Sequence, residues 1–289
     1  MKLLILCDAP EAGGDRGLRA ALAEQFREHK QSVEWLTPGQ MLTAQFAIAD
    51  EPALVIDCLG ESGNPCAPWL AEDLFAQLLA HCNERDWIWL LLSDSRVFPA
   101  SNKRRFVETD SLASSSDAGQ RLLPRETFIA SVVSRHIVLR TGPVIASRGD
   151  NLLTRLLPKL RAGGLVVVPE VQRFCPTPAT DVARVIAAIH DQLDCGAVCW
   201  GAYHYESADP ATGYEFAEVV LAAATQFWPL EGAVQLQGAA VSSEVDIFPL
   251  LNCQRIRDTF GIQQLPWRRA IPALLKQIYA NNPSESGLS

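Results

Sequence analysis

Residues 87–92 read WIWLLL, a short apolar run that leads directly into the polar sequence SDSRVF at 93–98. Continuous runs of this kind are typical of strands that are buried on both faces of a parallel sheet. Similar runs stand at 2–7 (KLLILC), 53–58 (ALVIDC) and 136–140 (HIVLR). Helical patterns separate these runs, so the sequence predicts an α/β protein with a Rossmann-like, doubly wound parallel sheet.

The alternation of strands and helices also predicts how the sheet is arranged. We expect Lys2–Cys7 in the centre of the sheet, flanked by Ala53–Cys58 and by Ser32–Leu36. The second half is less regular and is predicted to form a small C-terminal α/β lobe. The predicted core comprises residues 1–142 and 181–200, the predicted lobe comprises 143–180 and 201–280, and the polar stretch 281–289 is predicted to be a disordered tail.

Composition excludes several classes of protein. The 289 residues carry a net charge of −8, and the densest basic cluster is only Lys103–Arg105, so a nucleic-acid partner is not expected. No run approaches the roughly 20 apolar residues of a membrane span, and the N-terminus lacks the pattern of a signal peptide. The eight scattered cysteines are typical of reduced thiols in the cytoplasm, and the dispersed histidines predict no metal site.

A series of short motifs runs through the chain in a definite order. They are SDSRVF at 93–98, FVETD at 106–110, RTGPV at 140–144, Pro176-Thr177 with Asp181, and Tyr203-His204 followed by YEFA at 214–217. In order and spacing this series resembles the dTDP-4-dehydrorhamnose reductases, a branch of the extended short-chain dehydrogenases. The resemblance implies a Rossmann core, a lobe for a nucleotide sugar, and reduction of a sugar ketone by NAD(P)H.

The residues that this chemistry requires are missing. In the family a tyrosine donates the proton, a lysine one helical turn later lowers its pKa, and a threonine orients the carbonyl group. By the resemblance these three positions fall on Ala118, Leu122 and Asp94, and no tyrosine precedes Tyr203. We therefore predict no catalytic residue at these degenerate positions, and the sequence favours a protein that is not an enzyme.

The expected cofactor loop is also altered. A dinucleotide fold needs a tight glycine turn after its first strand, so that backbone N–H groups face the pyrophosphate. Gly14 and Gly17 match the last two glycines of the family pattern, but the first glycine is displaced and Pro10 removes a donor. These two glycines, with Asp57 and Ser93, are the weak candidates for cofactor contacts. The sequence predicts no resident cofactor, with NAD(P) as the alternative.

A substrate cleft is expected between the two lobes, lined by Arg96, Thr141, Thr177 and His204. Two of these residues have another interpretation: Arg96 in a salt bridge with Asp94 or Glu108, and His204 in packing between a helix and a strand. Asp57 and Asp94 end two strands at the edge where open α/β sheets place their sites, which leaves a carboxylate pair as a further alternative.

The motifs and the missing residues together predict a repurposed, non-catalytic relative. It would bind a small nucleotide or sugar, or act as a regulatory module with a protein partner. One alternative is an NAD(P)-dependent reductase or epimerase of dTDP-4-keto sugars that uses unusual residues. Another is a different enzyme that uses Asp94, Asp57 or His204.

Overall fold

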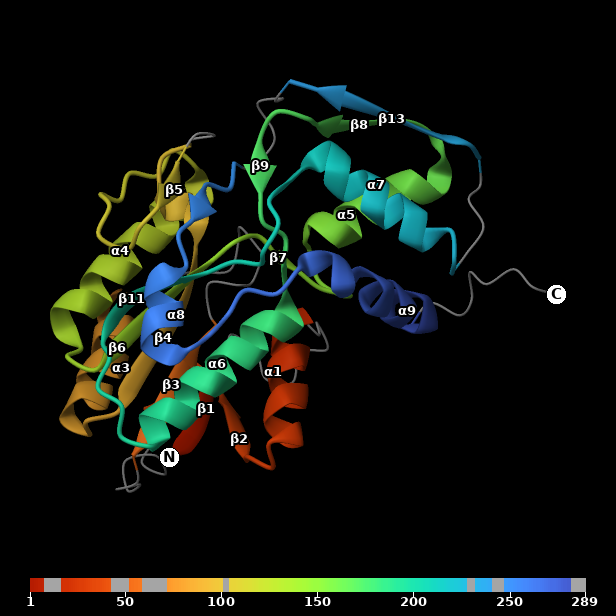
Figure 1. Ribbon diagram of the computed structural model, residues 1–289. Coiled ribbons are helices and arrows are strands. Elements are labelled where there is room, and N and C mark those ends of the chain that lie inside the picture. The colour runs from red at the N-terminus through yellow and green to blue at the C-terminus, as the bar shows by residue number, and fades with distance from the viewer. Residues whose placement is uncertain are drawn as a thin grey trace.

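The computed structural model describes residues 1–7, 17–42, 52–58, 72–100, 104–227, 232–240 and 247–281. Within them, six parallel strands form the central sheet in the order β11-β6-β4-β3-β1-β2 (Figure 1). These strands are β1 (Lys2–Leu6), β2 (Val33–Leu36), β3 (Ala53–Asp57), β4 (Ile88–Asp94), β6 (His136–Thr141) and β11 (Gly201–Tyr205). The predicted Rossmann-like α/β fold is confirmed.

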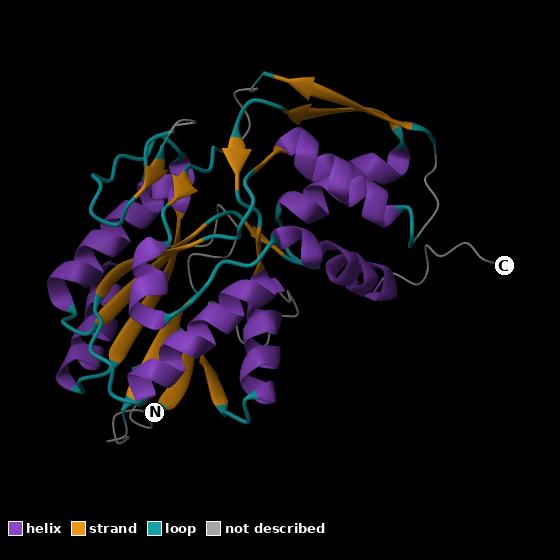
Figure 2. Ribbon diagram, in the orientation of Figure 1, coloured by secondary structure: helices purple, strands orange, loops and turns teal. Residues whose placement is uncertain are grey.

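Helices cover both faces of this sheet, as the doubly wound fold requires (Figure 2). The helices α1 (Gly17–Glu28), α6 (Ala179–Asp194) and α8 (Gln254–Phe260) share a buried apolar cluster with Leu3, Ile5, Leu54 and Ile56. On the other face α3 (Glu72–Glu84) and α4 (Asp117–Val132) pack against Leu4, Val55, Trp89 and Leu91. Because strand side chains alternate between the two faces, every second residue of β1, β3 and β4 belongs to each cluster.

The position of the first strand differs in part from the expectation. β1 pairs with β3 and with β2, so both predicted neighbours are confirmed. The expectation that Lys2–Cys7 lies in the centre of the sheet is wrong, because only β2 follows β1 on one side, whereas β3, β4, β6 and β11 lie on the other. The short α2 (Pro38–Met41) follows β2 and begins with a capping box between Thr37 and Gln40.

The second lobe packs around its own apolar cluster, which includes Leu153, Val166, Phe216, Trp267 and Leu274. Its helices are α5 (Leu152–Ala162), α7 (Gly213–Ala224) and α9 (Ile271–Asn281). A parallel pair of strands, β8 (Gly164–Pro169) and β13 (Val234–Ala239), lies on its outer side (Figure 1). The shorter strands are β7 (Val144–Ile145), β9 (Arg173–Phe174), β10 (Thr177–Pro178) and β12 (Ala211–Thr212), which pair as β7 with β10 and β9 with β12.

The expected boundary at residue 201 is wrong. Residues 201–205 form β11, which pairs with β6 along its whole length and buries Tyr203 and Tyr205 in the core. The chain returns to the core a second time, where β14 (Leu250–Leu251) pairs with β5 (Arg105–Phe106) and α8 packs on α6. These segments bury apolar residues against the sheet, which their distance in sequence does not reveal. Of the expected tail, residues 282–289 lie outside the described residues.

Candidate functional site

Three polar side chains form a row across the sheet, on the face that α4 covers. Ser93 on β4, Arg140 on β6 and His204 on β11 are direct register partners. From α4, the Glu126 carboxylate accepts hydrogen bonds from Nε and Nη2 of Arg140, at 3.0 and 2.7 Å, and from the Ser93 hydroxyl. All four side chains are buried, so Glu126 balances the charge of Arg140 inside the protein.

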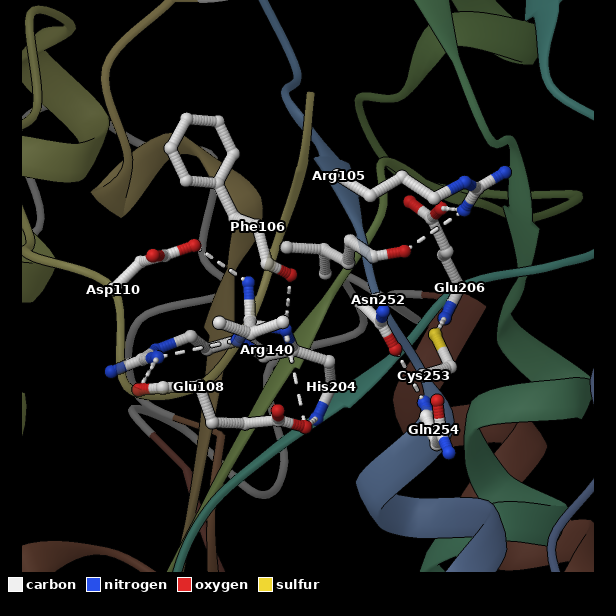
Figure 3. Close-up of polar contacts among 12 residues, drawn as sticks. Arg105, Phe106, Glu108, Asp110, Arg140, His204, Glu206, Asn252, Cys253 and Gln254 are labelled. Atoms are coloured by element: carbon white, nitrogen blue, oxygen red, sulfur yellow. Dashed lines mark hydrogen bonds and ion pairs between the residues drawn. The ribbon is translucent and has the colours of Figure 1, made fainter.

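The His204 imidazole is held on both sides. Arg140 Nη1 donates to Nε2 at 3.2 Å, which leaves Nδ1 to donate to the Phe106 carbonyl at 3.1 Å (Figure 3). Burial and the charge of Arg140 lower the pKa of His204 to about 3, so the ring is neutral. The His204 backbone N–H donates to Oε1 of Glu108, a carboxyl whose pKa is raised, chiefly by burial.

This arrangement corrects the expectation that His204 lines a substrate cleft. The side chain has no exposed surface, and both ring nitrogens have partners within the fold. The same contacts argue against His204 as a catalytic residue of a different enzyme. With both ring nitrogens hydrogen-bonded within the fold, the imidazole has neither a proton nor a lone pair to offer a ligand.

Asp57 was a candidate for a cofactor contact, and the structure places it elsewhere. Its carboxylate is fully buried at the end of β3 and forms an ion pair with Arg125 of α4 at 2.5 Å. Arg125 also stacks over the Phe75 ring of α3, 4.9 Å from its centroid. Asp57 therefore lies between the sheet and its helices, where its charge is matched by a cation rather than directed to a ribose. Ser93, the other strand residue expected to contact the cofactor, likewise has a partner within the fold, because its hydroxyl donates a hydrogen bond to Glu126.

Arg96 and Asp94 form the salt bridge that the sequence left as one alternative. Asp94 accepts from the backbone N–H of Arg96 at 2.7 Å and from its guanidinium at 2.5 Å. The same guanidinium lies 4.8 Å from the centroid of the Phe248 ring, so it joins the end of β4 to a segment far along the chain. Asp94 and Asp57 each form an ion pair with a different arginine. These contacts argue against the alternative in which the two carboxylates act as a pair.

The two degenerate catalytic positions lie on α4, which begins after its N-cap Ser116. Leu122 is buried in the apolar cluster of the core, and Ala118 is partly buried one turn earlier. Neither side chain donates a proton or carries a charge. Judged by these residues and by the engaged side chains of Asp57 and Ser93, the described part of the site does not fit a nicotinamide ribose or the acid that reduction needs.

Of the two glycines expected to bind a cofactor, Gly14 lies outside the described residues. Gly17 begins α1 and lies against the loop that follows β7: a Cβ atom added to it would come within 1.9 Å of the Ala146 Cβ. The close approach explains a glycine at this position without a ligand. It also shows that the start of α1 meets the start of the second lobe.

Thr141 and Thr177, also expected in the cleft, lie where the chain passes between the two lobes. Both are buried; Thr141 donates to the Ser93 carbonyl at 3.4 Å, and Thr177 donates to the Cys175 carbonyl at 3.0 Å. Between them Gly142 is so crowded that an added Cβ would lie 2.5 Å from the Cys175 carbonyl oxygen. Both hydroxyls thus donate to backbone carbonyl groups at the junction of the two lobes. The expectation that they face a ligand is corrected.

Sequence reasoning missed Glu206, which directly follows β11 at the same junction. Its side chain is buried, and Oε1 accepts a hydrogen bond from Arg105 Nη1 at 2.7 Å (Figure 3). Burial raises the pKa of Glu206 to about 7, against the opposing effects of the Leu251 backbone, the Arg105 guanidinium and the Cys175 thiol. A lone acidic residue directly after a buried strand, in YHYES at 203–207, was the available signal.

No group of three or more His, Cys, Asp or Glu side chains within the described ranges is arranged to hold a metal ion. Among the helices that the structure describes, none has the length and hydrophobicity of a membrane span.

Comparison with known proteins identifies relatives in the family that the sequence motifs resemble. A family model described as RmlD substrate binding domain matches residues 69–280. The dTDP-4-dehydrorhamnose reductase of Aggregatibacter actinomycetemcomitans is 24% identical over 188 residues, which cover 63% of this chain and 64% of that protein. The chain thus aligns with somewhat less than two thirds of this relative's length.

Solved structures share the fold over nearly the whole chain. A dTDP-4-dehydrorhamnose reductase from Clostridium acetobutylicum superposes with a TM-score of 0.74 at 18% identity, covering 96% of this chain and 99% of that one. The Bacillus anthracis dTDP-4-dehydrorhamnose reductase, solved in complex with NADP, gives a TM-score of 0.73 at 15% identity with the same coverage. At these identities the similarity shows the fold alone.

Proposed function

This chain belongs to the family of the RmlD substrate binding domain, and on that premise we propose that it binds a nucleotide sugar without reducing it. The ligand lies at the carboxyl edge of the central sheet, where the second lobe joins the core. Open α/β sheets bind their ligands outside the carboxyl ends of the strands. We further propose that the protein works in the cytoplasm, and that a regulatory role through a protein partner is open to it.

One observation carries this proposal. Helix α4 buries Leu122, Arg125, Glu126 and Ile129, and Ala118 and Leu122 stand where the family resemblance places the acid and its lysine. A general acid typically contributes about 10²–10⁴-fold to a reaction rate. Of the described tyrosines, Tyr203 and Tyr205 are buried, the Tyr205 hydroxyl donates to Asp181 at 2.8 Å, and Tyr214 and Tyr279 pack in the apolar cluster of the second lobe.

Charge at the same edge supports an anionic ligand. Arg104 precedes β5 and Arg105 begins it, at the carboxyl end of the sheet; their side chains are 58% and 42% exposed, and each also has a carboxylate partner within the fold, Asp110 and Glu206. Guanidinium groups match the geometry of phosphate oxygens. A nucleoside diphosphate sugar, rather than a free sugar, therefore fits the proposal best.

A binding measurement tests the first half of the proposal. We expect a dTDP-sugar to raise the melting temperature, since a ligand at 100 Kd adds about 2.7 kcal/mol of stability. NADPH and NADH, tested in parallel, are expected to give little or no shift. Calorimetry with the same three ligands then gives the dissociation constants, and an absence of binding by every dTDP-sugar tested would contradict the proposal.

An activity measurement tests the second half. Purified protein with NADPH or NADH and a dTDP-4-keto sugar should show no oxidation of the cofactor, beside a true reductase as the control. The double variant Ala118→Tyr, Leu122→Lys is expected to remain inactive, because the loop after β1 is altered separately. Turnover by the wild type near that of the control would refute the non-catalytic half.

The relatives favour one alternative function. Both the curated relative and the two superposed structures are named as dTDP-4-dehydrorhamnose reductases, and one of them was solved with NADP. NAD(P)-dependent reduction or epimerisation with unusual residues is therefore the second candidate. The two functions differ in the binding of NAD(P)H and in the turnover of a dTDP-4-keto sugar, which a reductase couples to net oxidation of NAD(P)H and an epimerase converts without it.

A further inference from the structure

Cys7 and Cys58 follow directly on two adjacent strands of the central sheet. β1 and β3 are parallel, and their last register pair is Leu6 with Asp57. The Cys58 backbone N–H donates to the Leu6 carbonyl at 3.1 Å, which continues the same hydrogen-bond ladder by one residue. Cys7 is therefore the register partner of Cys58. Of the cysteines that the structure describes, no other two stand on neighbouring strands in this way.

The two side chains also share one face of the sheet. Strand side chains alternate between the faces, so Cys7 continues the row of Ile5, and Cys58 continues the row of Ile56. Both isoleucines, and Cys58 itself, belong to the apolar cluster that the core shares with α1 and α6. Cys7 and Cys58 are 1% and 3% exposed. Two thiols thus lie side by side in apolar surroundings.

The spacing of the two cysteines suits a covalent bond between them. Neighbouring strands lie about 4.8 Å apart, and the Cα atoms of a disulfide are usually about 4.4–6.8 Å apart. Both residues carry thiols in this structure. Because they are register partners, the bond can close without sliding one strand along the other.

The pair stands at the edge of the sheet where a dinucleotide-binding fold places its ligand. The carboxyl end of the first strand is where such a fold begins the turn that faces the pyrophosphate. We propose that Cys7 and Cys58 are a redox-active dithiol, which a hydroperoxide converts into a disulfide across the ends of β1 and β3. The site does not depend on the proposed binding of a nucleotide sugar.

The oxidation balances with one molecule of hydrogen peroxide. The thiolate of one cysteine attacks an oxygen and breaks the O–O bond, which gives a sulfenic acid, and the other oxygen leaves as water with the proton of the thiol. The second thiol attacks the sulfenic sulfur, the S–S bond forms, and the hydroxyl leaves as a second water. Two electrons pass from the sulfurs to the peroxide. Two equivalents of a small thiol such as glutathione restore the dithiol. Burial excludes bulky oxidants, so a small peroxide is the class of oxidant that fits.

Peptide mapping of the wild-type protein tests the dithiol directly. The native protein is treated with hydrogen peroxide until the exposed Cys195 is oxidised, and the remaining thiols are then alkylated in denaturant. Tandem mass spectrometry of the digest should find peptides joined through Cys7 and Cys58, with the loss of two hydrogen atoms, and dithiothreitol should separate them. Oxidation of Cys195 without this link, or a link from either residue to a different cysteine, would overturn the proposal.

Two variants distinguish the disulfide from independent oxidation of the two thiols. Cys7→Ala and Cys58→Ala each remove one member of the pair, so the thiol that reacts first can advance only to the sulfenic acid. Dimedone, added in denaturant, should label that sulfenic acid in one of the two variants and should label neither residue in the wild type. Cys66→Ala removes the next cysteine along the chain, so it is the matched control and should form the wild-type link.

Two results with these variants would refute a reaction between the thiols. One is a dimedone label on both Cys7 and Cys58 in the wild type, and the other is no label in either variant. If the variants fail to fold, the peptide map of the wild type still decides the proposal, because it needs no substitution.

Discussion

Arg140 and His204 are register partners on adjacent parallel strands, and the guanidinium of the first donates to the imidazole of the second at 3.2 Å. A cation beside a histidine disfavours the imidazolium, and burial acts in the same direction. The contact thus turns the most obvious titratable candidate in the sequence into a neutral structural residue. It also makes the stability of this region sensitive to pH.

His204 should contribute to acid unfolding. Its folded pKa of about 3 lies below the ordinary value of 6.5, so its contribution to stability is present above pH 6.5 and is lost as the pH falls toward 3. His204→Gln is expected to lower the melting temperature at pH 8 and to flatten its fall between pH 6.5 and 4. Melting curves across this range check the sign, with the exposed His29→Gln as the control. An unchanged slope in His204→Gln would show that the ring titrates normally.

Glu126→Gln should be strongly destabilising. The change leaves Arg140 as a buried cation without its counter-charge, at a cost of about 3–5 kcal/mol. Equilibrium denaturation with urea measures the loss. The control is Asp150→Asn, which removes an exposed carboxylate from Arg155 and is expected to cost less than about 1 kcal/mol. Equal losses for the two variants would contradict the burial of the network.

The Asp57–Arg125 pair permits a double-mutant cycle. Each single variant, Asp57→Leu and Arg125→Met, leaves one buried charge uncompensated and should cost about 3–5 kcal/mol. The double variant should cost clearly less than the sum, because it removes both charges and keeps apolar volume between β3 and α4. Additive losses would mean that the two groups do not interact. Since neither side chain faces the proposed ligand, nucleotide-sugar binding should survive in the double variant.

Gly17→Ala tests the contact between α1 and the loop after β7. The added methyl group overlaps Ala146, so we expect a loss of about 1–3 kcal/mol in denaturant unfolding. The second-site change Ala146→Gly should restore most of it. Gly39→Ala is the control, because no atom lies within 4 Å of the added Cβ, and it should be nearly neutral. A silent Gly17→Ala would indicate that the two segments do not touch.

Much of the fold follows from local pattern. The apolar runs around Lys2–Cys7, Ala53–Cys58 and WIWLLL at 87–92 can be read as buried parallel strands because each is apolar on both faces and too short for a helix. The missing tyrosine and lysine are also a property of the sequence, since Ala118 and Leu122 have no proton to give in any fold.

The pairing of polar side chains was decided only by the tertiary structure. Asp57 and His204 look alike in the sequence, as polar residues at the ends of apolar strands, but each meets a different arginine that lies far away along the chain. The boundary at residue 201 and the role of Glu206 were hidden for the same reason, because β11 pairs with a strand that lies 64 residues earlier and Glu206 pairs with Arg105, 101 residues away. Local sequence determines which backbone forms a strand, whereas the charge state of a buried group depends on neighbours that only folding brings together.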